Sequence, residues 1–292
     1  MSRQAYYQHK EVDFKKLALR GFIIQYVQEV RMDAPRMGCE KLYVMCREFF
    51  GDLFDIGRDA FYRILREGGL MLKLKKRHKV RTTDSWHEYP RYPNLIHGFV
   101  PDRINQLWVS DITYIWTQAG FCFLSLITDA YSHKIVGWQL APTLVYRYTQ
   151  EALHSAIENS KVPIKGLIHH SDRGVQYAYP AYTEILRNEG IRISMTQNGD
   201  PMENALAERV NGILKQEWLY LYDFADIRSV RAVLEPAIEF YNTRRPHASN
   251  NFLTPQQAET GKGILENRWR KKSWKSKGDY TPQGEGLEAN RT

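Results

Sequence analysis

The sequence predicts an α/β protein, in which a mixed β-sheet is flanked by helices and preceded by a small all-helical unit. Three observations lead to this fold class. Apolar residues in the first 70 positions recur at helical spacing. Three β-rich segments then follow one another between residues 107 and 140. After them, short apolar strands alternate with amphipathic helices, which indicates a sheet with helices on its faces.

The bulk composition sets the class of protein and its partner. At 292 residues the chain can bury a sizeable core, and its net charge of +8 favours a polyanionic partner. No apolar run approaches the roughly 20 residues of a membrane span, and the N-terminus has no apolar secretion signal. We therefore expect a cytoplasmic protein with no membrane partner. The three cysteines form no CxxC pair and are expected to be reduced thiols.

The first region, residues 10–70, is expected to hold three helices. Two of them cover Phe14–Arg31 and Cys39–Phe49, and a third, basic on one side, begins at Arg58. Three short helices with a basic last member suit a helix-turn-helix that enters a DNA groove, but a plain helical module has the same pattern. Arg58 and Arg63 are the candidate DNA contacts on the third helix.

A basic, proline-containing stretch from 71 to 103 is typical of a linker. Its charges either keep it solvated or lie along DNA phosphates. The candidate phosphate contacts in it are Lys73, Lys75, Lys76 and Arg77. At the other end, residues 261–292 form a tail that begins basic, with interleaved tryptophans, and ends with a composition typical of disorder.

Residues 104–260 are expected to form the main domain. The segments LWVSDITYIW, GFCFLSLITDAYS and HKIVGWQL are separated by short turns, which predicts an antiparallel meander. The elements expected after it are a helix over Leu144–Asn159, a strand over Gly166–His169, a helix around Ala181–Asn188, a strand over Arg192–Met195, and helices over Glu203–Glu217 and Val230–Tyr241. This order of elements is that of an RNase H-like fold.

Two acidic residues at strand positions are candidates for phosphodiester chemistry, which uses divalent metal ions held by carboxylates. Asp111 shares a half-buried strand face with apolar neighbours, where an unpaired acid is costly. The alternative for Asp111 is an exposed strand edge. Asp172 ends the strand GLIHHS and begins the turn SDRG, a place that a simple turn-forming Asp also favours. Acids that converge would repel one another unless metal neutralised them.

The helix near residue 208 supplies the third candidate. At 100° per residue, one polar stripe of this helix holds Asn204, Glu208, Asn211 and Lys215. Glu203 and Glu217 project toward the apolar side, so Glu208 is the better ligand. The stripe is either solvated or meets metal and phosphate. Arg173, next to Asp172, could contact phosphate or pair with an acid.

Several motifs together resemble a known family. WVSDITYI, HHSDRGVQY, SMTQNGDPMENALAERVNGILKQEW and YNTRRPH followed by TP resemble the integrase core of bacterial insertion-sequence transposases of the DDE class, relatives of retroviral integrase. The preceding stretch, from MGCEKLYVMC to IGRDAFYRILREGGL, resembles the helix-turn-helix that comes before this core in the same family.

The resemblance implies a function and a site. Asp111, Asp172 and Glu208 match the catalytic triad, which would hold two Mg²⁺ ions, with Mn²⁺ as a substitute. The implied reaction is cleavage at the transposon end, which frees a 3′-hydroxyl, and attack of that hydroxyl on another phosphodiester. Lys215 matches a position associated with binding the element's end. Double-stranded DNA and further copies of the chain are the implied partners, in the bacterial nucleoid.

Two departures from the family pattern bear on this interpretation. Many members have Asp where this chain has Glu203. Members are also often made as a fusion with an upstream reading frame that supplies another helix-turn-helix and a leucine zipper, and no heptad run is visible here. The upstream-frame protein is thus a candidate partner. Two alternatives remain open: a nuclease of the same fold that does not join DNA, and a non-catalytic relic that only occupies element ends.

Overall fold

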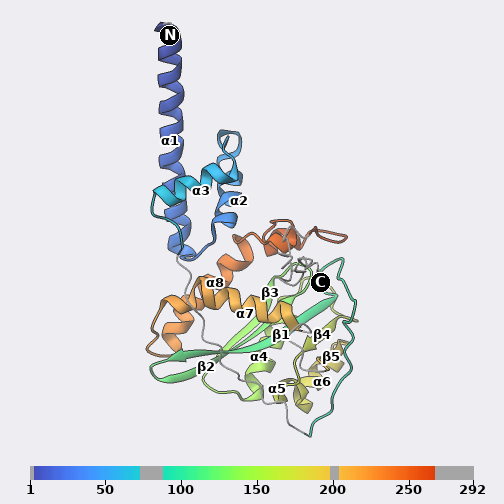
Figure 1. Ribbon diagram of the computed structural model, residues 1–292. Helices are drawn as coiled ribbons and strands as arrows, with labels where there is room; N and C mark the ends of the chain where they lie inside the picture. The colour runs from blue at the N-terminus through green and yellow to red at the C-terminus, as the bar shows by residue number, and fades with distance from the viewer. Residues whose placement is uncertain (1–2, 73–87, 198–203, 267–292) are drawn as a thin grey trace, which may run out of the picture.

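The computed structural model describes residues 3–72, with side chains from Lys15 onward, and residues 88–197 and 204–266 (Figure 1). In these ranges, no helix is both long and apolar enough to span a bilayer.

Three helices open the chain: α1 (Arg3–Asp33), α2 (Cys39–Phe50) and α3 (Arg58–Glu67). All three were expected, although α1 begins at Arg3, well before Phe14; the residues between these two positions include no glycine or proline that would end a helix. Their shared core consists of Ile23, Val27, Val30, Leu42, Cys46, Phe61 and Leu65. Figure 1 shows the N-terminal half of α1 extending beyond α2 and α3.

The centre of the molecule is a five-stranded sheet with the order β3-β2-β1-β4-β5. Its strands are β1 (Leu107–Thr117), β2 (Gly120–Asp129), β3 (Ile135–Ala141), β4 (Ile168–Ser171) and β5 (Arg192–Met195). β1, β2 and β3 pair antiparallel, whereas β4 runs parallel to both β1 and β5. The predicted meander and the mixed sheet of an RNase H-like fold are therefore confirmed.

Helices cover both faces of this sheet. They are α4 (Tyr146–Glu158), α5 (Val175–Ala178) and α6 (Pro180–Asn188), then α7 (Ala205–Glu217), α8 (Ile227–Thr243) and α9 (Pro255–Ala258). Side chains alternate along β2, so that Leu124 joins the core shared with α7 and α8 and Ile127 joins the core shared with α4 and α6. The short helices α5 and α9 were not expected from the sequence.

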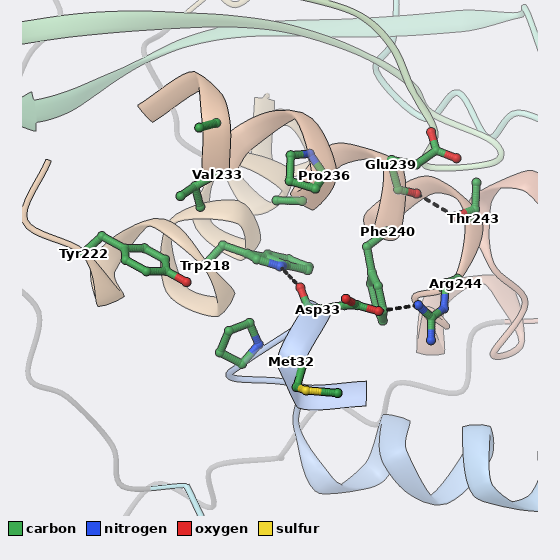
Figure 2. A pocket seen from close by; sticks show the side chains of 13 residues that line it. Met32, Asp33, Trp218, Tyr222, Val233, Pro236, Glu239, Phe240, Thr243 and Arg244 are labelled. Atoms are coloured by element: carbon green, nitrogen blue, oxygen red, sulfur yellow. Dashed lines mark hydrogen bonds and ion pairs between the residues drawn. The ribbon is translucent and has the colours of Figure 1, made fainter. Parts of the chain in front are cut away.

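A small joint fastens the N-terminal helices to the rest of the molecule. The indole Nε1 of Trp218 donates a hydrogen bond to the carbonyl oxygen of Asp33 at 2.7 Å, and the carboxylate of Asp33 pairs with Arg244 at 2.6 Å (Figure 2). Both contacts join the end of α1 to the region of α7 and α8. The division into units at 10–70, 71–103, 104–260 and 261–292 stays a prediction.

Candidate active site

Asp111 lies near the middle of β1 and is half-buried beneath α7. One of its carboxylate oxygens, Oδ2, accepts a hydrogen bond of 2.8 Å from Nδ2 of Asn211. Burial raises the pKa of Asp111 to about 7, and repulsion by Asp172 and, to a smaller extent, by Glu208 adds to this rise, whereas the bond from Asn211 lowers the pKa. Asp111 therefore senses the charge of both other candidate acids.

Asp172 comes directly after β4, the strand parallel to the start of β1. This arrangement brings the end of β4 beside the middle of β1. The Oδ1 atom of Asp172 accepts the backbone N–H of Gly174 at 3.0 Å. A Cβ atom at position 174 would lie 2.9 Å from that oxygen, so a side chain there would displace the carboxylate. The Gly174 backbone thus fixes the direction of Asp172.

Glu208 lies in the first turn of α7 and is exposed. The polar stripe that the sequence predicted for this helix faces β1. At one end of it, Asn204 Nδ2 donates to the carbonyl oxygen of Ser110 at 3.0 Å, and Asn211 bonds to Asp111. Glu208 stands between these two amides on the same stripe. Three separate elements therefore present the three candidate acids to one region.

The chemistry of this set fits a hard divalent cation, because carboxylate oxygens are the ligands such ions prefer. The pKa of Asp111 is raised first by burial, and the like charge of Asp172 adds to this rise. However, within the described ranges no three His, Cys, Asp or Glu side chains form a group that could enclose a metal ion. The role of the acids as metal ligands stays a prediction.

The predicted DNA-contact residues fall in different surroundings. Arg58 and Arg63 are exposed on α3. The Nε atom of Arg173 donates to the carbonyl oxygen of Thr196 at 2.6 Å, so this side chain braces the loop of Asp172 against the end of β5. Lys215 is half-buried; burial lowers its pKa, and the negative charge of Asp111 counteracts that effect. Lys73, Lys75, Lys76 and Arg77 lie outside the described residues.

Two of the candidates are too deeply placed for a surface role. Asn204 is 6% exposed and Asn211 is 4% exposed, and both donate to β1. We therefore expect these two amides to position β1 and Asp111 rather than to touch DNA. The helical stripe indicated the side on which they lie, but periodicity carries no information about depth.

From the sequence, the other two acids near this helix, Glu203 and Glu217, were expected to be poorer ligands than Glu208. Glu217 lies at the end of α7 and makes two bonds to Arg245, of 2.8 and 2.7 Å, and its carboxylate lies 3.8 Å from Lys41 of α2. Burial alone would raise the pKa of Glu217, but the guanidinium of Arg245 brings the pKa below its ordinary value. This acid is committed to an ion pair. Glu203 lies outside the described residues.

A buried polar group lies behind β1 and had no role in the sequence-based prediction. The Nε2 atom of His169 is 2.7 Å from Ser110 Oγ and 2.9 Å from the hydroxyl of Tyr182. Burial lowers the pKa of His169 to about 3, so the imidazole is neutral. The three residues tie β1, β4 and α6 together directly behind Asp111. In the sequence, the one sign of this group was that Ser110 is the residue next to Asp111.

Family models and known proteins are similar to this chain. Residues 101–201 and 189–255 match two family models, each described as an integrase core domain. The chain is 38% identical over 203 residues to a 31 kDa protein of insertion element IS600 from Shigella sonnei, covering 68% of this chain and 74% of that protein. It is 30% identical over 213 residues to the transposase for insertion sequence element IS629 from Shigella sonnei, covering 73% and 71%.

A solved structure is also similar. The integrase catalytic core domain of HTLV-2, determined in complex with magnesium, is 21% identical and has a TM-score of 0.43, with 54% of this chain and 97% of that chain covered.

Proposed function

Because this chain belongs to the family of bacterial insertion-sequence transposases of the DDE class, we propose that it cleaves DNA at the ends of an insertion sequence and joins the freed 3′-hydroxyl to target DNA. One observation carries the proposal at the level of the site. Asp111 on β1, Asp172 after β4 and Glu208 on α7 come from separate elements, yet β4 pairs with β1 and Asn211 of α7 bonds to Asp111, so the three acids lie in one region.

In this proposal, Asp111, Asp172 and Glu208 are the catalytic residues and would hold two Mg²⁺ ions, or Mn²⁺ in their place. When bound, such ions neutralise the clustered acids, stabilise negative charge on the phosphate and activate the attacking oxygen.

The chain's own groups prepare the site for this chemistry. Asn211 orients the carboxylate of Asp111 through its N–H, and the Gly174 backbone N–H does the same for Asp172. Arg173 holds the loop that carries Asp172 by its bond to the carbonyl of Thr196. Lys215, next to Asp111, supplies a cation that can bind a phosphate oxygen beside the reacting one. Preorganised groups of this kind lower the cost of reaching the reactive geometry.

The partners in this proposal are the double-stranded element ends and the target DNA, bound by several copies of the chain together. The net charge of +8 and the exposed Arg58 and Arg63 on α3 support contact with phosphates. The upstream-frame protein of the element and association with the nucleoid belong to the same proposal.

The test is a cleavage and joining assay with a duplex oligonucleotide that carries the terminal repeat of the element, in the presence of Mg²⁺. Wild-type protein should give joined products, and Glu208→Gln should give none, because the amide loses the charge but keeps the shape. A matched control is Glu184→Gln, which changes an exposed acid on α6. It should keep wild-type activity.

Each outcome distinguishes the proposal from its rivals. Joined products that persist in Glu208→Gln would contradict the assigned role of Glu208. Cleavage without joining by the wild type would favour a nuclease of the same fold. Binding without any cleavage would identify a non-catalytic DNA-binding protein and exclude both enzymatic functions.

A further inference from the structure

A cavity of about 420 Å³ lies at the edge of β1, beyond the candidate active site. Among the described strands, β4 pairs with β1 only at Leu107, Trp108 and Val109, so the later part of β1 has no partner on that side. Residues from both faces of β1 line the cavity, including Tyr114 and Ile115, which places the cavity at the strand's edge.

The opposite wall is the segment that follows α7, from 219 to 224. It is held to the β1–β2 hairpin by two backbone hydrogen bonds, from Gln118 N to Phe224 O at 2.8 Å and from Ala119 N to Ala225 O at 3.1 Å. Backbone hydrogen bonds therefore hold both walls in place, so the cavity is part of the folded structure.

Several exposed aromatic side chains line this cavity. Trp116 is 63% exposed, Tyr220 is 53% exposed and Tyr222 is 47% exposed, and all three line the cavity together with Tyr114. Large aromatic side chains gathered at an exposed hollow mark a binding site rather than a folding core. Flat aromatic rings are the surfaces on which proteins stack single nucleobases.

None of the three candidate acids lines the cavity, but two of its lining residues, Tyr114 and Lys215, belong to the elements that carry Asp111 and Glu208. Tyr114 lies three residues after Asp111 on β1, about 10 Å along the strand, and burial together with the charge of Asp172 raises its pKa. Lys215, which also lines the cavity, lies one helical turn beyond Asn211, whose amide bonds to Asp111. Lys215 thus lines the cavity and also interacts with the charge of Asp111.

We propose that this aromatic pocket, formed by Tyr114, Trp116, Lys215, Tyr220 and Tyr222, receives one unpaired nucleobase of the DNA strand whose phosphate lies at the carboxylates. Lys215 would bind the backbone phosphate between that base and the reacting position. This inference rests on the proposed function, because it assumes that DNA is the ligand of the neighbouring site.

An unpaired base fits the pocket better than paired DNA. A base is accessible to stacking on both faces only after it leaves the duplex, and enzymes that act on DNA extrude single nucleotides into enclosed pockets for this reason. The pocket offers stacking rings, the cation of Lys215 and one exposed carboxylate, that of Asp223. Aromatic rings together with a cation are the combination that binds single strands with little sequence preference. The terminal sequence of the element is therefore not needed to test the proposal.

The binding experiment uses a duplex with a short unpaired 3′ end that contains 2-aminopurine, together with a blunt duplex of the same sequence. Wild-type protein should quench the fluorescence of the unpaired 2-aminopurine by stacking, and should bind the unpaired end about five-fold or more tightly than the blunt end, as expected for one stacked base. Trp116→Ala and Tyr220→Ala should each lose the quenching and most of this preference.

The matched control is Phe22→Ala, which removes an aromatic side chain that is 59% exposed on α1. It should behave as wild type in both measurements. Circular dichroism of all variants separates a local effect from unfolding, and the second pocket variant replaces any that does not fold. Photochemical cross-linking of 5-iodouracil at the unpaired position should give an adduct on Trp116 or Tyr220.

The result that would overturn the proposal is equal binding of blunt and unpaired ends by the wild type, with no change in fluorescence. Concentration-dependent self-association that is lost in Trp116→Ala, without quenching, would instead assign the pocket to a second copy of the chain and also overturn it. Joining activity without base quenching would refute only the base pocket. Base quenching without cleavage or joining by the wild type would support the pocket and refute the proposed transposition.

Discussion

The charged side chain of Asp111 destabilises the folded protein at the place it occupies. Its carboxyl group is half-buried, lies near two other acids, and gains one hydrogen bond from Asn211. Burial and like charges both favour the neutral form, which is why the pKa rises to about 7. Above that pH the folded protein must keep a charge that the unfolded chain would hold in water at no cost. The clustered negative charge of this site therefore lowers the stability of the folded protein.

The first prediction concerns Asp111→Asn in the absence of metal. The folded pKa of Asp111 lies above its unfolded value of 3.8, so its favourable contribution to stability is complete below the unfolded pKa and is lost as the pH rises through about 7. At about pH 8 the variant should be more stable than wild type by at least about 1 kcal/mol, while cleavage and joining are lost. Thermal melts in EDTA at low and high pH measure this.

Asp52→Asn, an exposed acid in the turn after α2, is the control for removing one negative charge. It should leave the stability unchanged at both pH values. Equal melting temperatures of wild type and Asp111→Asn above neutral pH would show that Asp111 carries no such cost.

The second prediction concerns Gly174. A Cβ atom there would meet Asp172 Oδ1 at 2.9 Å, and the short Asp side chain has to turn away. Gly174→Ala should therefore reduce joining by about tenfold or more, because misplacement of a reacting group by about 1 Å is costly. The melting temperature should change little.

Gly57→Ala is the matched control for Gly174→Ala. Gly57 is also the residue before a helix, with a similar extended backbone, but nothing lies within 4 Å of its added Cβ atom. Normal joining by Gly174→Ala, or an equal loss in Gly57→Ala, would contradict the close-contact explanation.

Among the elements, the packing of α4 on β3 depends on one missing side chain. A Cβ atom at Gly137 would lie 2.3 Å from the carbonyl oxygen of Ala152 and 2.7 Å from the Cβ atom of Ala156. The helix backbone therefore rests directly on the strand. This close approach requires glycine at position 137 and alanine opposite it on α4.

The third prediction follows from this contact. Gly137→Ala should lower the free energy of unfolding by about 1–3 kcal/mol or more, as overpacking does. Gly21→Ala is the control, because Gly21 lies inside α1 with nothing within 4 Å of the added Cβ atom, and should stabilise the protein by about 0.5–1 kcal/mol. Urea unfolding measures both. An unchanged midpoint for Gly137→Ala would show that α4 can move away without cost.

At the level of elements, the sequence predicted the long helices and all five strands, since their apolar periods are clear. Strand β5 begins and ends at the predicted residues. The sequence did not predict helices α5 and α9, because four residues are too few to show a helical period. The helical stripe on α7 indicated which side faces β1, but the burial of Asn211 and the aromatic pocket arise from residues about 100 positions apart in the chain.

Across the whole molecule, one buried ion pair connects the N-terminal helices with both long helices of the main domain. Glu217 at the end of α7 binds Arg245, which follows α8 and is 3% exposed, and also lies near Lys41 of α2. The motif YNTRRPH contains this arginine. Arg245 thus holds α2, α7 and the end of α8 together, away from the candidate acids.

The fourth prediction compares this pair with an exposed one. Arg245→Met leaves Glu217 buried without its partner and should cost about 3–5 kcal/mol. Arg244→Met removes the exposed partner of Asp33 and should cost at most about 1 kcal/mol. Since the folded pKa of Glu217 is below its usual value, the ion pair's contribution is present above about pH 4.5 and is lost as the pH falls further. The difference between wild type and Arg245→Met should therefore shrink in acid.

The fifth prediction concerns the charge of the whole chain. If the basic residues neutralise phosphates, the logarithm of the DNA affinity should fall by about 0.9 for each logarithmic unit of salt and each phosphate contacted. Arg63→Ala should reduce that slope by about one phosphate. Binding titrations across a salt series measure the slope. A complex insensitive to salt would contradict a phosphate-binding role for α3.

The contacts at Asp33 fix the direction of the long first helix. With 31 residues, α1 is about 46 Å long at 1.5 Å per residue. Its C-terminal end is held by the indole of Trp218 and the guanidinium of Arg244. The apolar core that the first three helices share with α7 and α8, and the contact of Lys41 with Glu217, hold the same end of the helix, so the direction of its whole length of about 46 Å is set by contacts at one end.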